Sequence, residues 1–472
     1  MDKLPLELKQ RICSFLHASP RLLKPIRLVS KDFESAAAPY LIPRLFLFRH
    51  PDSCAEVKAI VEHPVFSKYV TTLVVDLSVL KSHDNIESWI EDHTELEYEE
   101  VEWSDFEPDG QEYDEYGPVL KTCALSNKFH AQCERFYEAR QEATRSLQSE
   151  YEGNWKAHQD IVRIQASTSF QSFFLETVTH TFRICPNLTN IVISPPVQIQ
   201  DVIARRTHIF EDILPISASW VRPQDSFPVD FQLEEMLQAT NHSLFGLNSL
   251  TIIDFPVGCS EKIEIESLKS LTSLKHVRIS HNRLNFDPTT KLNLKQEVAL
   301  RAAHSLETLW VEMPAHIYEH VNANGLLRAT DSRSLRDILL SNVCVSENVL
   351  VDFLLRHASS LQHLSFGLAL STGSWVSTLR RISRRMEKLE RVQLTGITET
   401  RESEMVTFSS EWCLKARNFL TKGTELPEPV PYDQFYEFEE ERSSNCSSPL
   451  RNHILPEDGL WEEYDGEVNS YF

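Results

Sequence analysis

One short apolar motif recurs through most of this chain and restricts the folds that it can adopt. In each copy, apolar residues occupy the first, fourth and sixth positions, so residues four and six lie on the same side of an extended strand. The copies are Val70-Leu73-Val75, Leu188-Ile191-Ile193, Leu247-Leu250-Ile252, Leu274-Val277-Ile279, Leu306-Leu309-Val311, Leu335-Ile338-Leu340, Leu361-Leu364-Phe366 and Leu389-Val392-Leu394. From residue 247 onward, successive copies begin 27, 32, 29, 26 and 28 residues apart. This near-constant spacing indicates a repeated structural unit.

The spacing is close to the ~20–29-residue period of leucine-rich repeats, in which each unit contributes a short strand and a helix. We therefore predict an α/β fold whose body is an irregular leucine-rich-repeat-like solenoid, because no single unit can bury its apolar face alone. Only the copy that begins at Leu274 continues into the fuller repeat pattern with Asn282, so irregular turns are expected. For any single copy, the simpler alternative is a buried strand in an ordinary α/β sheet.

The first forty residues predict a separate helical module. Leu4, Leu8, Ile12, Phe15 and Leu16 fall at helical spacing along one side of a helix of about four turns. A segment of this size buries too little apolar surface to be stable alone. Its apolar side must therefore pack on the rest of the chain or on a second protein.

This module resembles the F-box, the helical segment by which substrate receptors of SCF-type ubiquitin ligases bind the Skp adaptor and, through it, the cullin. The resemblance is carried by Leu4-Pro5, Glu7-Leu8, Ile12, Leu16 and Leu28-Val29-Ser30-Lys31. It implies that the adaptor contacts are Leu4, Pro5, Leu8, Ile12, Leu28 and Val29.

Two positions depart from the family pattern. Phe33 stands where many members carry tryptophan, and Pro25 falls where the second F-box helix runs. A proline inside a helix costs about 3 kcal/mol, although Pro25 could instead open a short helix. The alternative interpretation of this segment is an ordinary N-terminal helical hairpin that packs on the following domain.

The length of 472 residues exceeds what a single hydrophobic core usually supports, which predicts a small module and a larger body. We expect the F-box-like module at 1–45, the repeat body at 46–424 and an acidic, mostly flexible tail at 425–472. Within the body, we expect a disordered acidic loop at 91–117 and a helical insertion at 120–182.

The formal net charge of −22 is concentrated in the loop and the tail. Residues 91–117 contain thirteen acidic residues and no lysine or arginine, and residues 425–472 contain thirteen acidic residues and two arginines. The other residues nearly balance in charge, so we expect no broad surface for nucleic acid. Aromatic residues within the loop leave open that it docks a basic partner. A tail folded back along the concave face would compete with a client there.

Several classes of protein lack support in the sequence. There is no run of 18 apolar residues and no signal-peptide core, so we expect a protein of the cytoplasm or nucleus with no membrane partner. Nine cysteines show no C-x-x-C pair and no zinc-spaced histidines, which predicts free thiols and no metal or other cofactor. Phosphate-binding loops, a nucleophile elbow and an H-E-x-x-H motif are also missing, so we expect no catalytic residues.

Residue five of each repeat motif is expected to face outward on the concave surface. This gives a row of Val192, Thr251, Arg278, Trp310, Leu339, Ser365 and Gln393. The candidates for client binding within it are Arg278, Trp310, Leu339, Ser365 and Gln393. A tryptophan beside an arginine is typical of a protein interface, although other parts of the chain could cover the row. The sequence thus predicts a non-enzymatic receptor that binds a Skp-type adaptor and an unknown protein client. The alternatives are a non-catalytic interaction scaffold and, from another class, a hydrolase in an unrecognised fold.

Overall fold

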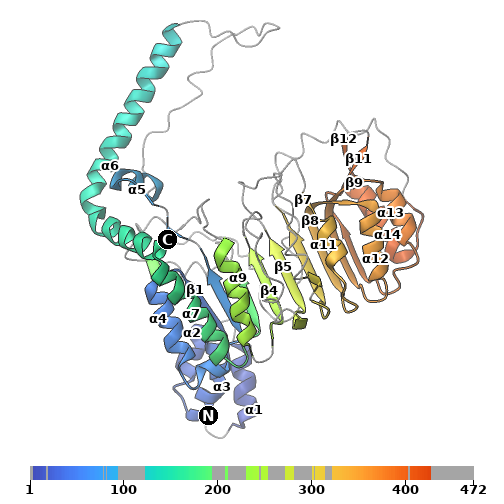
Figure 1. The fold of residues 1–472 in the computed structure, drawn as a ribbon, viewed down its shortest axis with the longest axis horizontal. Coiled ribbons are helices and arrows are strands. Elements are labelled where there is room, and N and C mark those ends of the chain that lie inside the picture. The colour runs from blue at the N-terminus through green and yellow to red at the C-terminus, as the bar shows by residue number, and fades with distance from the viewer. Residues whose placement is uncertain are drawn as a thin grey trace.

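A computed structural model gives the arrangement of most of the chain (Figure 1). The residues that it describes are 4–16, 20–77, 79–80, 82–93, 123–193, 208–210, 230–243, 246–253, 272–280, 300–301, 303–313, 321–401 and 404–426. The expected acidic loop lies outside them from residue 94 onward, and the tail lies outside them from residue 427 onward. Residues 91–93, which we expected in the loop, instead belong to a helix.

The protein has a mixed α/β fold built on one mostly parallel sheet of twelve strands, which confirms the predicted fold class at this level. The hydrogen-bonded order is β1-β2-β3-β4-β5-β6-β8-β9-β11-β12, with β7 on β8 and β10 on β9. The strands are β1 (Arg44–Phe48), β2 (Thr72–Asp76), β3 (Asn190–Ile193), β4 (Ser249–Ile253), β5 (His276–Ser280), β6 (Thr308–Glu312), β7 (Val321–Asn322), β8 (Asp337–Ser346), β9 (His363–Thr372), β10 (Arg391–Leu394), β11 (Thr398–Arg401) and β12 (Glu404–Thr407).

All eight predicted strands are present, and their motifs are aligned across the sheet. The fourth residues form one row of direct partners, running Leu73, Ile191, Leu250, Val277, Leu309, Ile338, Leu364 and Val392. These residues and the sixth residues of the motifs belong to a single buried cluster. Alternation along each strand thus sends both positions to the same face, as expected.

Helices cover this face of the sheet (Figure 1). The same buried cluster takes residues from α4 (Pro51–Val61), α7 (Thr168–Ile184), α9 (Asp230–Ala239), α11 (Asn324–Ala329), α12 (Glu347–Arg356), α13 (Trp375–Ile382) and α14 (Ser410–Lys422). The array is therefore two layers deep, with parallel strands on one side and helices on the other.

A long helix, α6 (Cys123–Ala166), projects from the β1 end of the sheet (Figure 1). Its last turns contribute Ile161 to a second cluster, together with Phe48 of β1 and Phe210. The short helix α5 (Ile86–His93) packs on α6, where the rings of Trp89 and Trp155 are 5.8 Å apart. At β1, α6 thus covers the face of the sheet opposite the one on which α4 and α7 pack.

The N-terminal module consists of α1 (Leu6–Phe15), α2 (Pro20–Ile26) and α3 (Lys31–Leu41), at one end of the molecule below α4 (Figure 1). Pro20 opens α2 and Pro25 lies within it, so the expectation that Pro25 opens a short helix is wrong. The module ends before β1 begins at Arg44, and Leu45 belongs to the core of the sheet. The boundary at residue 45 therefore falls inside a strand that the sequence analysis did not identify.

Candidate binding surfaces

The N-terminal module has a small core of its own. Cys13 of α1, Leu23 of α2 and Phe33 of α3 are buried together with Ala36 and Ala37. This cluster is separate from the core of the sheet. Ser30 caps α3, because its Oγ accepts a hydrogen bond from the amide of Phe33 at 3.3 Å.

The inner face of α1 carries small or charged side chains. Lys9 is fully buried against α3, and its ammonium donates a hydrogen bond to Asp32 at 2.6 Å. One turn further along, Cys13 is also fully buried. The sequence analysis placed Leu4 and Leu16 in one strip with Leu8, Ile12 and Phe15, but Leu4 and Leu16 pack against this small core. Leu4 precedes the helix. At roughly 100° per residue, Leu16 lies about 80° around the helix axis from Leu8.

The large apolar side chains of the module face outward instead. Ten large hydrophobic residues are exposed in the part of the chain that the structure describes, and seven of them lie between residues 6 and 29. These seven, here called the apolar strip, are Leu6, Leu8, Ile12, Phe15, Leu22, Leu28 and Val29. Their exposure ranges from 38% at Ile12 to 78% at Leu28. Large exposed apolar patches are typical of protein interaction sites, which makes these residues a candidate binding surface.

The six residues expected to contact the adaptor do not share one environment. Leu8, Ile12, Leu28 and Val29 belong to the apolar strip, and Pro5 is exposed at the start of α1. Leu4 is half-buried because it packs against the small core, so only part of its side chain is accessible to a partner. The sequence analysis did not select Leu6, Phe15 or Leu22, although Phe15 follows Ile12 at helical spacing and is 75% exposed.

The second candidate surface is the face of the sheet that the helices do not cover. The strand register places Arg278, Trp310, Leu339, Ser365 and Gln393 side by side on β5, β6, β8, β9 and β10. All five are partly exposed, as the expected row requires. Toward the other end of the sheet, the same row continues as Thr251, Val192 and Val74, which are buried. The expectation that Thr251 and Val192 lie on the accessible surface is therefore wrong. The accessible part of this face therefore begins at β5.

Arg278 and Trp310 lie where the accessible part of this face begins, on β5 and β6. The guanidinium carbon of Arg278 lies 5.4 Å from the Trp310 ring centroid, and an Arg278 nitrogen lies 3.9 Å from a carboxylate oxygen of Glu312. The first distance is within the range of a cation–π interaction. Polar pairs border the row: His276 Nδ1 lies 3.2 Å from the hydroxyl of Thr308, and His363 hydrogen bonds with Asp337. The surface thus combines a fixed aromatic group with polar groups suited to a protein client.

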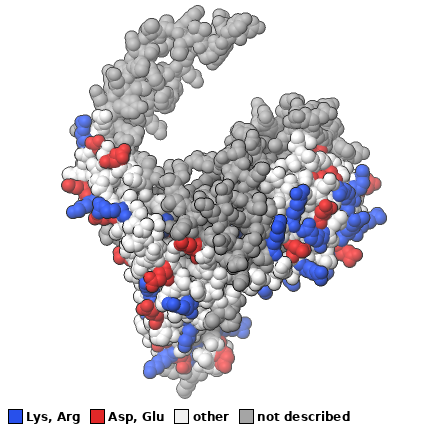
Figure 2. Space-filling model, viewed as in Figure 1, with Lys and Arg blue, Asp and Glu red and all other residues white. Residues whose placement is uncertain are grey.

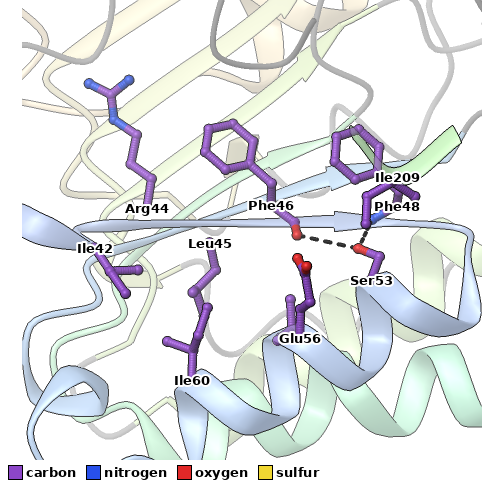
Figure 3. A pocket seen from close by; sticks show the side chains of 10 residues that line it. Ile42, Arg44, Leu45, Phe46, Phe48, Ser53, Glu56, Ile60 and Ile209 are labelled. Carbon is purple, nitrogen blue, oxygen red and sulfur yellow. Dashed lines mark hydrogen bonds between the residues drawn. The ribbon is translucent and has the colours of Figure 1, made fainter. Parts of the chain in front are cut away.

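A pocket lies where β1 meets α4 (Figure 3). Its lining is mainly apolar and includes Leu45, Phe48 and Ile60, with Glu56 at one side. The only nucleophilic side chain in the lining is Ser53, whose Oγ accepts a hydrogen bond from the Phe48 amide at 2.9 Å. This hydroxyl also donates a hydrogen bond to the Phe46 carbonyl at 3.5 Å, so it joins β1 to the start of α4. We assign the pocket no chemistry.

The five cysteines whose side chains the structure describes are free thiols, and all but Cys344 are buried. Cys13, Cys54, Cys185, Cys344 and Cys413 are free, and burial raises the pKa of Cys185 to about 12 and the pKa values of Cys54 and Cys413 to about 11. These thiols are protonated at neutral pH and therefore unreactive. Within the described ranges, no group of three or more histidine, cysteine or acidic residues could hold a metal ion. The helices among those residues also lack the combination of length and hydrophobicity that a membrane span needs.

Comparisons with known proteins add no relative to this picture. No protein-family model matches the chain, and a search of curated proteins finds no match.

Proposed function

We propose that this protein is a substrate receptor of an SCF-type ubiquitin ligase. The apolar strip would bind a Skp-type adaptor and, through it, the cullin, while the open face of the sheet would bind a protein client. The receptor contributes proximity, because ubiquitin transfer is performed by other subunits. Such a protein works in the cytoplasm, the nucleus or both, without a cofactor.

The orientation of α1 is the observation that carries this proposal. A helix that packed only on its own chain would turn its leucine and isoleucine inward, because each large apolar side chain contributes about 1.5–3 kcal/mol when buried. Here Lys9 and Cys13 face α3, and Leu8 and Ile12 face away from it. This arrangement is costly for an isolated hairpin and suits a module that binds a second protein.

The body of the protein supports the receptor role through its regularity. Consecutive strands from β1 to β6 are parallel neighbours, and α4, α7 and α9, which lie between them in the sequence, pack on one face of the sheet. We interpret this arrangement as an irregular leucine-rich-repeat-like solenoid. Solenoids of this kind leave one continuous face of the sheet available for a large partner.

Co-purification of the full chain with a Skp-type adaptor tests the proposal. The double variant Leu8→Asp/Ile12→Asp should lose the adaptor, because it places two charges in the apolar strip without altering the buried face of α1. Leu414→Asp is the matched control, since Leu414 on α14 is 46% exposed and Leu8 is 47% exposed. If the double variant still bound the adaptor, the F-box assignment would be wrong.

A second comparison separates a receptor from a scaffold that presents no client for degradation. Protein turnover should be measured in cells that carry the wild-type chain or the Leu8→Asp/Ile12→Asp variant. A receptor predicts that at least one protein is longer-lived with the variant. Unchanged turnover of all proteins would favour the scaffold.

A further inference from the structure

A cluster of basic side chains lies between α13 and β10. Residues 380–391 contain six arginine or lysine residues and two glutamates. Arg381 is held by Glu347 at 2.9 Å, and the other five are exposed. These five, here called the basic rim, are Arg380, Arg384, Arg385, Lys388 and Arg391. Figure 2 shows lysine and arginine side chains gathered over this end of the molecule.

The five side chains of the basic rim make no ion pair within the described part of the chain, although Glu387 and Glu390 lie in the same segment. By contrast, Arg381 pairs with Glu347, and Lys415 of α14 pairs with Glu411 at 2.7 Å. Like charges held close together repel one another, so such a cluster is stabilised by an anionic group.

The backbone of the basic rim adds a second cost. Arg384 has a φ of 62°, in the left-handed region, where a residue with a Cβ is strained by roughly 1–2 kcal/mol. Glycine is the usual residue at such a position after a helix.

The C-terminal tail of this chain begins at the same edge of the sheet. The hairpin β11–β12 lies beside the second half of β9, so α14 starts on that side. Helix α14 then packs along β10, and its thirteen residues span about 20 Å back toward the start of the strands (Figure 1). The chain remains on the body as far as Leu426, which packs against the core. Arg391 begins β10 at this edge, so the tail leaves the body close to the basic rim.

We propose that the acidic segment 433–441 of the tail docks on the basic rim of its own chain. This segment contains Asp433, Glu437, Glu439, Glu440 and Glu441 and no basic residue. It also contains Phe435, Tyr436 and Phe438, whose rings can stack on arginine side chains. Asp433 follows Leu426 by seven residues, and the prolines at 427, 429 and 431 favour an extended connection of about 20 Å. So short a tether gives the acidic segment an effective concentration in the millimolar range at the basic rim. Weak ion pairs between exposed side chains are then sufficient to hold the segment there.

Zero-length carbodiimide cross-linking of the full chain tests this contact. The reagent joins a lysine amine to a carboxylate that touches it, and Lys388 is the lysine of the basic rim. We expect cross-linked peptides that join Lys388 to the carboxylates of 433–441. This link should be lost at 1 M salt, because the Debye length is then about 3 Å and the attraction between exposed charges is screened. Lys422 serves as the internal reference, because it ends α14 and is close to the tail in the sequence.

The double variant Arg384→Gly/Arg385→Ser should lower the Lys388 link about fivefold relative to the Lys422 link, the loss expected for two exposed ion pairs. Arg384→Gly also relieves the left-handed strain, so this variant is expected to fold. Arg333→Gln/Arg336→Gln is the matched control, since it removes two exposed arginines before β8 and should leave the ratio unchanged.

Three results would overturn the proposal. The first is a Lys388 amine that forms no link while Lys422 does. The second is a link from Lys388 to carboxylates of 91–117, which would make that segment the occupant. The third is a link between isotopically light and heavy chains in a mixed sample, which would make the contact one between two copies.

Discussion

The ammonium of Lys9 and the carboxylate of Asp32 are 2.6 Å apart, yet only the lysine is buried. The Asp32 side chain is 63% exposed, and the Lys9 ammonium also lies 5.6 Å from the ring centroid of Phe33. A buried lysine needs such partners, because an unpaired charge in a core is strongly destabilising. This pair therefore fixes which side of α1 packs on α3, and so which side is left for a second protein.

Removal of Asp32 should destabilise the module more than removal of Lys9. In Asp32→Ala, the buried ammonium loses its acceptor, at a cost of about 1–2 kcal/mol, whereas Lys9→Met keeps the packed stem and removes the charge. Glu34→Ala is the control, because Glu34 also lies in the first turn of α3 and contributes to the same helix dipole. Hydrogen exchange of the α1 and α3 amides measures the difference. Equal protection in Asp32→Ala and Glu34→Ala would show that the ion pair contributes nothing.

Adjacent residues of β6 should respond in opposite ways to substitution. Trp310→Asp should abolish client capture in proximity labelling and leave the unfolding midpoint unchanged, because Trp310 lies on the open face and the new carboxylate can pair with Arg278. Leu309→Ala should instead destabilise the protein by about 2–5 kcal/mol, since Leu309 is fully buried. Client capture that survives Trp310→Asp would exclude the open face as the client site.

The turn from β9 into α13 should tolerate no side chain at Gly373. This glycine has a φ of 89°, and an added Cβ would overlap the Cβ and a carboxylate oxygen of Glu347. Glu347 accepts hydrogen bonds from the Ser374 amide and the Ser377 hydroxyl, so Gly373→Ala should cost about 2–3 kcal/mol through strain and lost hydrogen bonds. Gly396→Ala is the matched control, with a φ of 60° and open space around the new Cβ, and should cost about 1 kcal/mol. Urea unfolding followed by circular dichroism distinguishes the two, and equal losses would contradict the proposed clash.

The protein should lose stability as the pH falls below about 6.5. Burial lowers the pKa of His357 in the folded state, so the unfolded chain binds a proton at this position at a higher pH than the folded chain does. The contribution of the neutral imidazole is therefore present above the unfolded pKa and is lost on acidification toward the folded pKa. His357→Gln should reduce the slope of the free energy of unfolding between pH 6.5 and 5. Parallel slopes for the two proteins would show that another group is responsible.

The sequence predicted the body of this fold because its signal is local. A strand that buries one face repeats its apolar residues at every second position, and eight copies of one spacing identified eight strands with their inward residues. The same spacing occurs at Ile42, Leu45 and Leu47, which mark β1. This copy was missed because it was assigned to the helical module. The polar sequences of β11 and β12 carry no such pattern.

Contacts between distant residues could not be predicted in this way. The buried carboxylate of Glu347 binds Ser374 and Arg381, 27 and 34 residues away, and nothing in the sequence near Glu347 indicates these partners. In the same way, the helical spacing of Leu8 and Ile12 identified them as apolar neighbours but not which face of α1 packs inward. That choice depends on Asp32, which reaches Lys9 from α3.

Hydroxyl-radical footprinting of the full chain, with and without a purified Skp-type adaptor, tests the central claim most directly. We predict that oxidation of Leu8, Ile12, Phe15 and Leu28 falls several-fold when the adaptor is added. Oxidation of Val65, Ile184 and Leu414, which are exposed elsewhere, should stay constant. Unchanged oxidation of the apolar strip at saturating adaptor would contradict the account.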